Sequence, residues 1–110
     1  MWFNVPMDQS ALDAIASPRR REILRLVWDR ERSSQDIASH FDVSWPATSQ
    51  NLRVLEHAGL VRARRHGTTR FYRADRKRIG PLRAVLKQMW EADLDRLGRL
   101  AEDEDRRRSR

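Results

Sequence analysis

Cysteine is absent from this 110-residue chain, and features of several other protein classes are missing with it. Without cysteine the chain has no disulfide, no thiolate metal site and no thiol redox switch. No apolar run approaches the roughly 20 residues needed to cross a bilayer, and the start MWFNVPMDQS lacks the basic and apolar regions of a signal peptide. We therefore expect a protein of the reducing cytoplasm with no membrane partner.

Residue sets that carry catalysis or hold a cofactor are also missing. The sequence contains no recognisable Ser, His and acid set, no phosphate-binding loop and no close pair of buried carboxylates. Its three histidines, His40, His57 and His66, lie in three different segments and lack the spacing of metal ligands. These absences predict a protein that is not an enzyme, with no catalytic residue, no metal and no cofactor.

Positive charge is what the sequence has in excess. It contains 23 Lys and Arg residues against 16 Asp and Glu, which gives a formal net charge of +7 and a pI near 11.2. Only Lys77 and Lys87 are lysines. Such a chain suits a polyanionic partner such as a nucleic acid, although arginine bias from a GC-rich genome would give a similar composition. A chain of this length is expected to form one domain.

Helical and extended periodicities divide the chain into an N-terminal arm, a folded domain and a charged tail. The arm covers residues 1–7, the domain 8–102 and the tail 103–110, which we expect to be disordered. Helices are predicted over 8–16, 18–30, 44–58 and 75–102, and a further one from Ser33 or Ser34 to about residue 41. The last helix is expected to be interrupted near Gly80 and Pro81. Residues 60–74 are predicted to form a β-hairpin. The expected fold class is mainly α with a small β-hairpin.

The segment VSWPATSQNLRVLEHAGLV, residues 43–61, predicts a helix over 44–58. Ser44 suits the N-cap, Pro46 fits the first turn, and Gly59 suits the left-handed residue just past the end. At 100° per residue the buried side consists of Thr48, Leu52 and Leu55. A short helix and a three-residue turn precede this helix, so the pair forms a helix-turn-helix whose second helix can enter the major groove of DNA.

The opposite side of this helix carries short polar groups where a solvated helix usually has more Lys and Glu. Glutamine can pair with adenine, and arginine with guanine or phosphate, so we expect base or backbone contacts here, with a solvated face as the alternative. Trp45 either packs near Phe41 or contacts a thymine methyl group or a sugar. The predicted DNA contacts of the helix are Ser44, Trp45, Pro46, Ser49, Gln50 and Arg53.

The hairpin is expected to form a basic wing. Its strands carry Arg62, Arg64, Arg65 and Arg70 around a tip at Gly67 and Thr68. Clustered cations repel each other unless an anion arrives, so these arginines favour contacts with DNA phosphates or the minor groove. The predicted contacts are Arg64, His66, Thr68 and Arg70, although Thr68 could serve only as a turn residue.

An apolar stripe runs along the last predicted helix. It is longer than a small domain can cover from one side, so we predict that part of it faces a second copy of the chain. Burial against its own domain is the alternative. The predicted dimer-interface residues are Leu12, Leu82, Leu86, Met89, Trp90, Leu94 and Leu97.

A family resemblance is carried by three stretches taken together: SPRRREILRLV, SSQDIASHFDVSWPATSQNLRVLEHAGLV and RARRHGTTRFYRAD. Over residues 8 to about 100 the chain resembles the ArsR family of bacterial winged helix-turn-helix repressors. The resemblance implies a homodimer built from the first and last helices, a recognition helix in the major groove, and repression relieved by an effector. The third helix lacks cysteine and residues 75–102 lack histidine, so the chain is similar to the metal-independent branch, whose effector is commonly unknown.

The residues and the resemblance together predict a sequence-specific DNA-binding transcriptional regulator. We expect a dimeric repressor that binds an inverted-repeat operator through helix 44–58 and the wing 60–74, associated with the bacterial nucleoid. A winged-helix module for protein interaction, without specific DNA binding, is the alternative. Trp45 stands where the relatives often have Arg or Lys, and Asn51 where many have His. Because the first of these positions lies close to DNA in the family's docking, the preferred operator does not follow from the resemblance.

Overall fold

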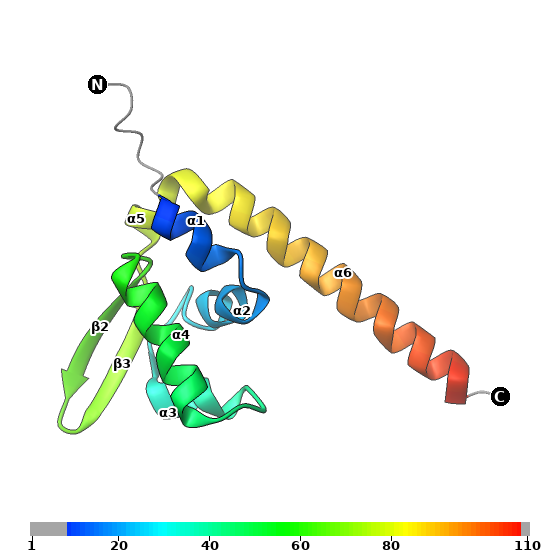
Figure 1. Cartoon of the computed structure of the whole chain (residues 1–110), viewed down its shortest axis with the longest axis horizontal. Coiled ribbons are helices and arrows are strands. Elements are labelled where there is room, and N and C mark those ends of the chain that lie inside the picture. Colours follow the sequence, from blue (N-terminus) through cyan, green and yellow to red (C-terminus); the bar gives the residue numbers. More distant parts are fainter. Residues whose placement is uncertain (1–8, 109–110) are drawn as a thin grey trace.

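The computed structural model describes residues 9–108, so the predicted arm and the last two residues of the tail lie outside the described part. Helices occupy most of that part, with one small sheet (Figure 1). In chain order the elements are α1 Gln9–Ile15, α2 Pro18–Leu26, β1 Arg32–Ser33, α3 Ser34–Ser39, α4 Trp45–His57, β2 Val61–His66, β3 Thr69–Ala74, α5 Arg76–Ile79, the 3₁₀ helix η1 Gly80–Leu82 and α6 Arg83–Arg108.

Serine side chains begin three of the helices. The hydroxyls of Ser17, Ser33 and Ser44 each accept a hydrogen bond from the backbone N–H three residues later, at 3.3, 3.0 and 3.3 Å. Each satisfies one of the N–H groups that a helix start leaves free, which is typically worth about 1 kcal/mol. The carboxylate of Asp36, three residues after the cap at Ser33, accepts a hydrogen bond from Arg32 at 2.9 Å.

Helix α2 ends at Leu26, four residues before the predicted end near residue 30. The carbonyl of Val27 accepts a hydrogen bond from the backbone N–H of Ala74 in β3. The chain must leave the helix at this point to bring that carbonyl to the sheet. The sheet, far away in sequence, therefore overrides the helical periodicity of residues 27–30.

The sheet has three antiparallel strands in the order β1-β3-β2. The hairpin of β2 and β3 was predicted, and its register runs from Val61 opposite Ala74 to His66 opposite Thr69. Gly67 opens the two-residue turn with φ +65°, a backbone region that favours glycine. Strand β1, whose two residues pair with Tyr72 and Phe71, was not predicted from the sequence.

The hydrophobic core lies between α4, the first two helices and the sheet. The predicted buried side of α4 is confirmed, since Thr48, Leu52 and Leu55 are all buried. Gly59 follows the helix with φ +76° and lets the chain turn into β2. The other fully buried large side chains are Ile15, Ile23, Leu24, Val27, Ile37, Leu60, Ile79 and Leu86.

The C-terminal helical region is interrupted by η1 at Gly80–Leu82, as predicted, and then continues as the long helix α6. Helix α6 reaches Arg108, so the tail predicted to be disordered from residue 103 is helical to that point. The spacing of Glu102 and Arg106, an acid four residues before an arginine, stabilises a helix. At 1.5 Å per residue α6 is about 39 Å long, and its C-terminal half projects away from the other elements (Figure 1).

Candidate nucleic-acid interface

Helix α4 holds its polar side outward because its opposite side is anchored in the core. Pro46, Gln50 and Arg53 are exposed, as predicted, whereas Ser49 is only partly exposed. Trp45 is 51% exposed at the first residue of the helix. Phe41, near which Trp45 was expected to pack as one alternative, contacts the guanidinium of Arg19, which lies 5.7 Å from the centre of the Phe41 ring. The indole of Trp45 is therefore available to a partner.

A small pocket of about 170 Å³ lies where α4 approaches the sheet. Besides Leu52 of the predicted buried side, three of its lining residues, Ser34, Glu56 and Tyr72, were not among the predicted site residues. No local pattern could have found them, since they come from α3, the far end of α4 and β3. The full lining is Ser34, Trp45, Ser49, Leu52, Arg53, Glu56, Arg70 and Tyr72.

The hairpin divides its arginines between two faces, because side chains alternate along a strand and cross-strand partners share a face. Arg70 and Tyr72 line the pocket beside α4, and Arg65, the partner of Arg70, lies on the same face. The opposite face carries Arg62, Arg64, Phe71 and Arg73. The wing is thus not one cluster of cations, and only part of it lies on the side of α4.

Most of the wing arginines are paired with acids of the same chain, which was not predicted from the sequence. Arg64 forms two hydrogen bonds to Glu31, at 2.6 and 2.7 Å. Arg70 contacts Glu56 at 3.2 Å, and Arg62 contacts Asp75 at 3.0 Å. The expectation that only an external anion could offset the repulsion at the wing was wrong, since carboxylates far away in sequence provide part of the compensation.

Arg65 differs from its neighbours, because within residues 9–108 it forms no ion pair. Its Cα partner across the hairpin is Arg70. Two like charges placed directly opposite each other destabilise a hairpin. An anion bound at this position would relieve that repulsion, which makes Arg65 a candidate that the predicted set of contacts omitted. His66 and Thr68 are exposed at the tip beside it.

The electrostatic environment of the wing favours charged pairs. Hydrogen bonds from Arg64 lower the pKa of Glu31, and the same contact raises the pKa of Arg64. Burial raises the pKa of Asp75, but hydrogen bonds from Arg62 and from the backbone of Arg78 outweigh it, so the net shift is downward. Burial also raises the pKa of Tyr72. At neutral pH the carboxylates of Glu31 and Asp75 therefore carry full negative charge.

The residues predicted to form a dimer interface fall into two groups. Leu82 and Leu86 are buried within their own chain, so the prediction was wrong for them: η1, which contains Leu82, and the first turn of α6 cover the core. Met89 and Trp90 are half-buried, and the Trp90 indole N–H donates to the Arg21 carbonyl at 2.8 Å. The exposed remainder is Leu12 at 37%, Leu94 at 57% and Leu97 at 62%.

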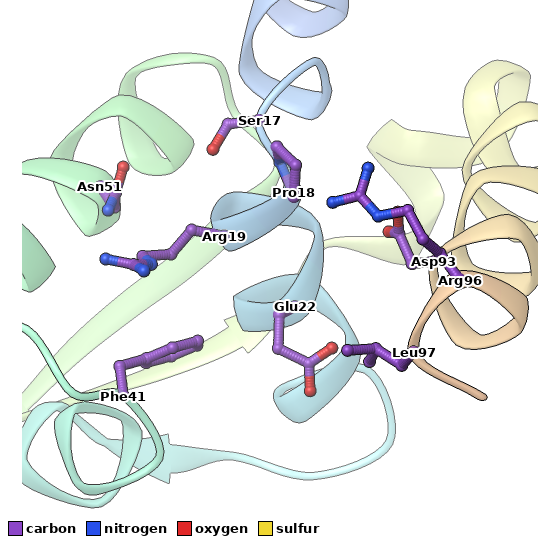
Figure 2. A pocket seen from close by; sticks show the side chains of 9 residues that line it. All are labelled: Ser17, Pro18, Arg19, Glu22, Phe41, Asn51, Asp93, Arg96 and Leu97. Carbon is purple, nitrogen blue, oxygen red and sulfur yellow. The ribbon is translucent and has the colours of Figure 1, made fainter. Parts of the chain in front are cut away.

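A second, larger groove of about 610 Å³ lies over the start of α2, between α4 and α6. Figure 2 shows Arg19 beside Asn51 and Phe41 on one side of α2, and Arg96 and Leu97 of α6 on the other. Asn51 accepts a hydrogen bond from Arg20 at 3.3 Å, so this departure from the family pattern connects α4 to α2. The residues that line this groove are Ser17, Pro18, Arg19, Glu22, Phe41, Asn51, Asp93, Arg96 and Leu97.

Histidine and acidic residues do not form a metal site in the described part of the chain, where no three of them are grouped as ligands. The His40 ring contacts the carbonyl of Asp36 at 2.9 Å, His57 is exposed near the end of α4, and His66 lies at the wing tip. None of the described helices is long and apolar enough to span a membrane.

Comparison with known proteins adds a family match. The model for bacterial regulatory proteins of the arsR family matches residues 17–63, which run from the cap of α2 into β2. The HTH-type transcriptional regulator Rv2034 of Mycobacterium tuberculosis is 34% identical over 94 residues, covering 86% of this chain and 88% of that protein. The chain spans 33% of the HTH-type transcriptional regulator Rv0324 of Mycobacterium tuberculosis, at 36% identity, and 66% of the transcriptional repressor SdpR of Bacillus subtilis, at 37% identity.

Solved structures agree with this match. A crystal structure of a possible transcriptional regulator for arsenical resistance has a TM-score of 0.65 and 40% identity, covering 82% of this chain and 94% of that one. The homodimeric winged helix-turn-helix DNA-binding domain of Mb0332 from Mycobacterium bovis, solved by NMR, has a TM-score of 0.65 and 33% identity. The matched part is 74% of this chain and 76% of that domain. The predicted winged helix-turn-helix fold is confirmed.

Proposed function

The chain belongs to the arsR family of bacterial regulatory proteins, and we propose that it is a DNA-binding transcriptional repressor that acts as a homodimer. The family consists of regulators and not of catalysts, so the prediction that the chain is not an enzyme is confirmed. A repressor acts at the chromosome, which places it in the cytoplasm in association with the nucleoid.

One observation carries this proposal: the exposed side of α4 and the Arg65–Arg70 face of the wing meet at the same pocket. Helix α4 is 13 residues long and is held by its buried side, so its other side can enter a major groove as a rigid unit. The wing follows α4 in the chain and runs beside it to an exposed tip, so it can reach the flanking backbone. One surface therefore combines groups that read bases with cations that bind phosphates.

In this arrangement Gln50 and Arg53 contact base edges, with Ser49 at the edge of the same surface. Glutamine binds adenine through two hydrogen bonds, and arginine binds guanine in the same way. Trp45 and Pro46 lie at the start of the helix, where an aromatic ring can contact a thymine methyl group or a sugar. Ser44 already uses its hydroxyl as the cap, so its role is to fix the helix start.

The wing supplies contacts that do not depend on sequence. Arg65 and Arg70 approach phosphates on the α4 side, and His66 and Thr68 approach the backbone from the tip. Arg64 points to the other face and is held by Glu31, so it reaches DNA only when that ion pair opens. Each phosphate contact adds to affinity and to its salt dependence.

The homodimer uses the apolar residues that the single chain leaves exposed. Leu12 of α1 and Leu94 and Leu97 of α6 form the proposed interface, with Met89 and Trp90 at its buried edge. A two-fold axis makes each contact occur twice and places two copies of α4 about one turn of DNA, ~34 Å, apart. The operator should then be an inverted repeat.

Metal ions take no part in this function as we propose it. The chain has no cysteine, and residues 75–102 have no histidine. The third helix therefore lacks the cysteine ligand, and the last helix lacks the histidine ligand, that metal-sensing relatives use. Relief of repression would need an effector of another kind. Adding zinc or a chelator should leave operator affinity unchanged, and a large reversible zinc effect with stoichiometric binding would contradict this.

The test of DNA reading is the variant Gln50→Ala. Binding to the operator and to random duplex is measured by fluorescence anisotropy. We expect operator affinity to fall by about 1 to 3 kcal/mol and random-DNA affinity to change little, because the variant removes a base contact and leaves the phosphate contacts in place. Gln35→Ala, an exposed glutamine on α3, is the matched control and should change neither. A chain that serves only protein interaction would bind no DNA with sequence preference.

A further inference from the structure

Two ion pairs of the wing are built in the same way. Arg64 of β2 crosses above the ring of Phe71, 4.9 Å from its centre, and ends on the carboxylate of Glu31 beside β1. Arg70 of β3 lies 5.7 Å from the ring centre of Tyr72 and ends on the carboxylate of Glu56 in α4. In both, an aromatic ring supports a guanidinium and an acid outside the hairpin occupies its hydrogen-bond donors.

These pairs contribute little to holding the fold together. Arg64 and Arg70 are exposed, and both acids are at least partly accessible to solvent. Exposed ion pairs of this kind generally stabilise a fold only slightly, because water and salt screen them. The rings already position the two guanidiniums through cation–π contacts, so the hairpin does not need the acids to orient its arginines.

A carboxylate presents to arginine what a DNA phosphate presents. Both are anions with two oxygens available for parallel hydrogen bonds from the guanidinium fork. Glu56 therefore occupies donors that a phosphate would use on the α4 side of the wing, and Glu31 occupies those of Arg64 on the opposite face. A phosphate that approaches Arg64 or Arg70 must first displace a carboxylate of the protein itself.

We propose that Glu31 and Glu56 are internal competitors of DNA phosphate that limit the affinity of the wing for DNA of arbitrary sequence. This inference rests on the proposed DNA-binding function. On random DNA the wing contacts are the main source of affinity, and each costs the opening of an ion pair. At the operator, base contacts from α4 are added, so the complex tolerates that cost. The two acids thereby keep a strongly basic chain from remaining on non-operator DNA.

The first experiment compares Glu31→Gln and Glu56→Gln with wild type on a random duplex over a range of salt concentrations. Each variant should bind about two- to five-fold more tightly, the equivalent of one exposed ion pair. The salt slope should rise by up to about 0.9 for each additional phosphate that a released arginine neutralises. Unchanged affinity and slope in both variants would overturn the proposal.

A matched control separates displacement from net charge. Asp42→Asn removes one negative charge from an exposed position beside the start of α4, where the acid has no ion pair with any residue of the described range. Its effect on random-DNA affinity should be smaller than that of either glutamine variant. An equal increase from Asp42→Asn would mean that net charge alone explains the result, and the proposal would fail.

A double-mutant cycle tests the identity of the partner. In an Arg64→Ala background, Glu31→Gln should give no increase in random-DNA affinity beyond that of Asp42→Asn, because no guanidinium is left to release. The same holds for Glu56→Gln in an Arg70→Ala background. If the full increase persists without the arginine, the acid acts by another route and the proposal is wrong.

The outcomes distinguish this inference from the proposed function. Binding to dextran sulfate, a polyanion without bases, is measured beside DNA binding. If wild type shows no sequence preference on any DNA but the glutamine variants still bind dextran sulfate more tightly than Asp42→Asn does, the repressor function fails and the competition stands. If wild type prefers its operator but the glutamine variants behave like Asp42→Asn, only the competition fails.

Discussion

At the scale of single residues, two adjacent arginines show that basic composition alone does not indicate DNA contact. The Arg20 guanidinium donates to the carbonyls of Ala14 and Asp13, and Arg21 donates to the carbonyl of Ile15. The carbonyls of Ala14 and Ile15 lie at the end of α1, where a helix leaves C=O groups without intrahelical partners, and the carbonyl of Asp13 also accepts from the backbone N–H of Ala16 at 3.2 Å. Part of the positive charge is therefore structural, and neither explanation of the composition, polyanion binding or genome bias, includes this use.

Thr48 is a residue whose replacement should stabilise the fold. It is 1% exposed on the buried side of α4, and its hydroxyl oxygen meets no hydrogen-bond partner among the described residues. A buried hydroxyl without a partner costs free energy, and valine has nearly the same shape. Thr48→Val should raise the free energy of unfolding by about 1 kcal/mol in urea denaturation. A loss of stability would show that the hydroxyl has a partner.

The ion pair between Arg21 and Asp93 connects residue chemistry to the arrangement of helices. Both guanidinium–carboxylate hydrogen bonds are 2.9 Å long, and both side chains are partly buried between α2 and α6. Asp93→Asn should lower the free energy of unfolding by roughly 1 to 2 kcal/mol at neutral pH, because it weakens hydrogen bonds to a charged group. Asp95→Asn, an exposed acid on the same helix, is the control and should change it little.

The effect of Asp93→Asn should depend on pH. Hydrogen bonds from Arg21 hold the pKa of Asp93 below its usual value. A carboxylate with a lowered folded pKa stabilises the fold above its unfolded pKa, about 4, and this contribution is lost as pH falls through the folded pKa. Wild type and variant should therefore converge in stability below about pH 4. A difference that stays constant down to pH 2 would contradict the ion-pair explanation.

At the scale of elements, the two faces of the wing should differ in their contribution to DNA binding. Arg65→Ala should weaken operator and random DNA alike and flatten the salt slope by about one unit, because it removes one phosphate contact. The free energy of unfolding should not fall, because the substitution also removes the repulsion between Arg65 and Arg70. Arg62→Ala at the hairpin base, where the arginine faces away from α4, is the control. Equal losses from both would mean that the face does not matter.

Elements whose bounds depend on neighbouring residues could be predicted from the sequence, whereas elements that depend on long-range contacts could not. Ser17 and Ser44 with their following prolines marked helix starts, and Gly59 marked an end, because caps and φ restrictions act over a few residues. The strand β1 has only two residues, and it forms because β3, about 40 residues later, pairs with it. The early end of α2 has the same cause. Such features follow from contacts that periodicity does not contain.

The candidate site divides in the same way. The exposed side of α4 followed from 3.6-residue periodicity, and the hairpin from its turn and its alternating residues. Glu31 and Glu56 could not be found, because they meet Arg64 and Arg70 only in the folded chain, 33 and 14 residues apart in sequence. Leu82 and Leu86 were misassigned because a stripe on a helix does not say which part its own domain covers.

At the scale of the whole molecule, the projecting half of α6 exposes apolar side chains that a second copy of the chain would cover. Leu94 and Leu97 are more than half exposed on a helix that leaves the body of the domain (Figure 1). The double variant Leu94→Glu, Leu97→Glu should sediment as a monomer of about 13.1 kDa, whereas wild type should have twice that mass at micromolar concentration. Gln88→Glu, which adds charge to an exposed polar position of α6, should remain dimeric. An unchanged dimer in the double variant would place the interface elsewhere.

A symmetric dimer that reads DNA with two copies of α4 requires a binding site with two-fold symmetry. Selection of bound duplexes from a random-sequence pool by wild type, followed by sequencing, tests it most directly. We expect enrichment of an inverted repeat whose half-site centres lie one helical turn, ~34 Å, apart. A pool that shows no enrichment, or an enriched site without two-fold symmetry, would contradict it.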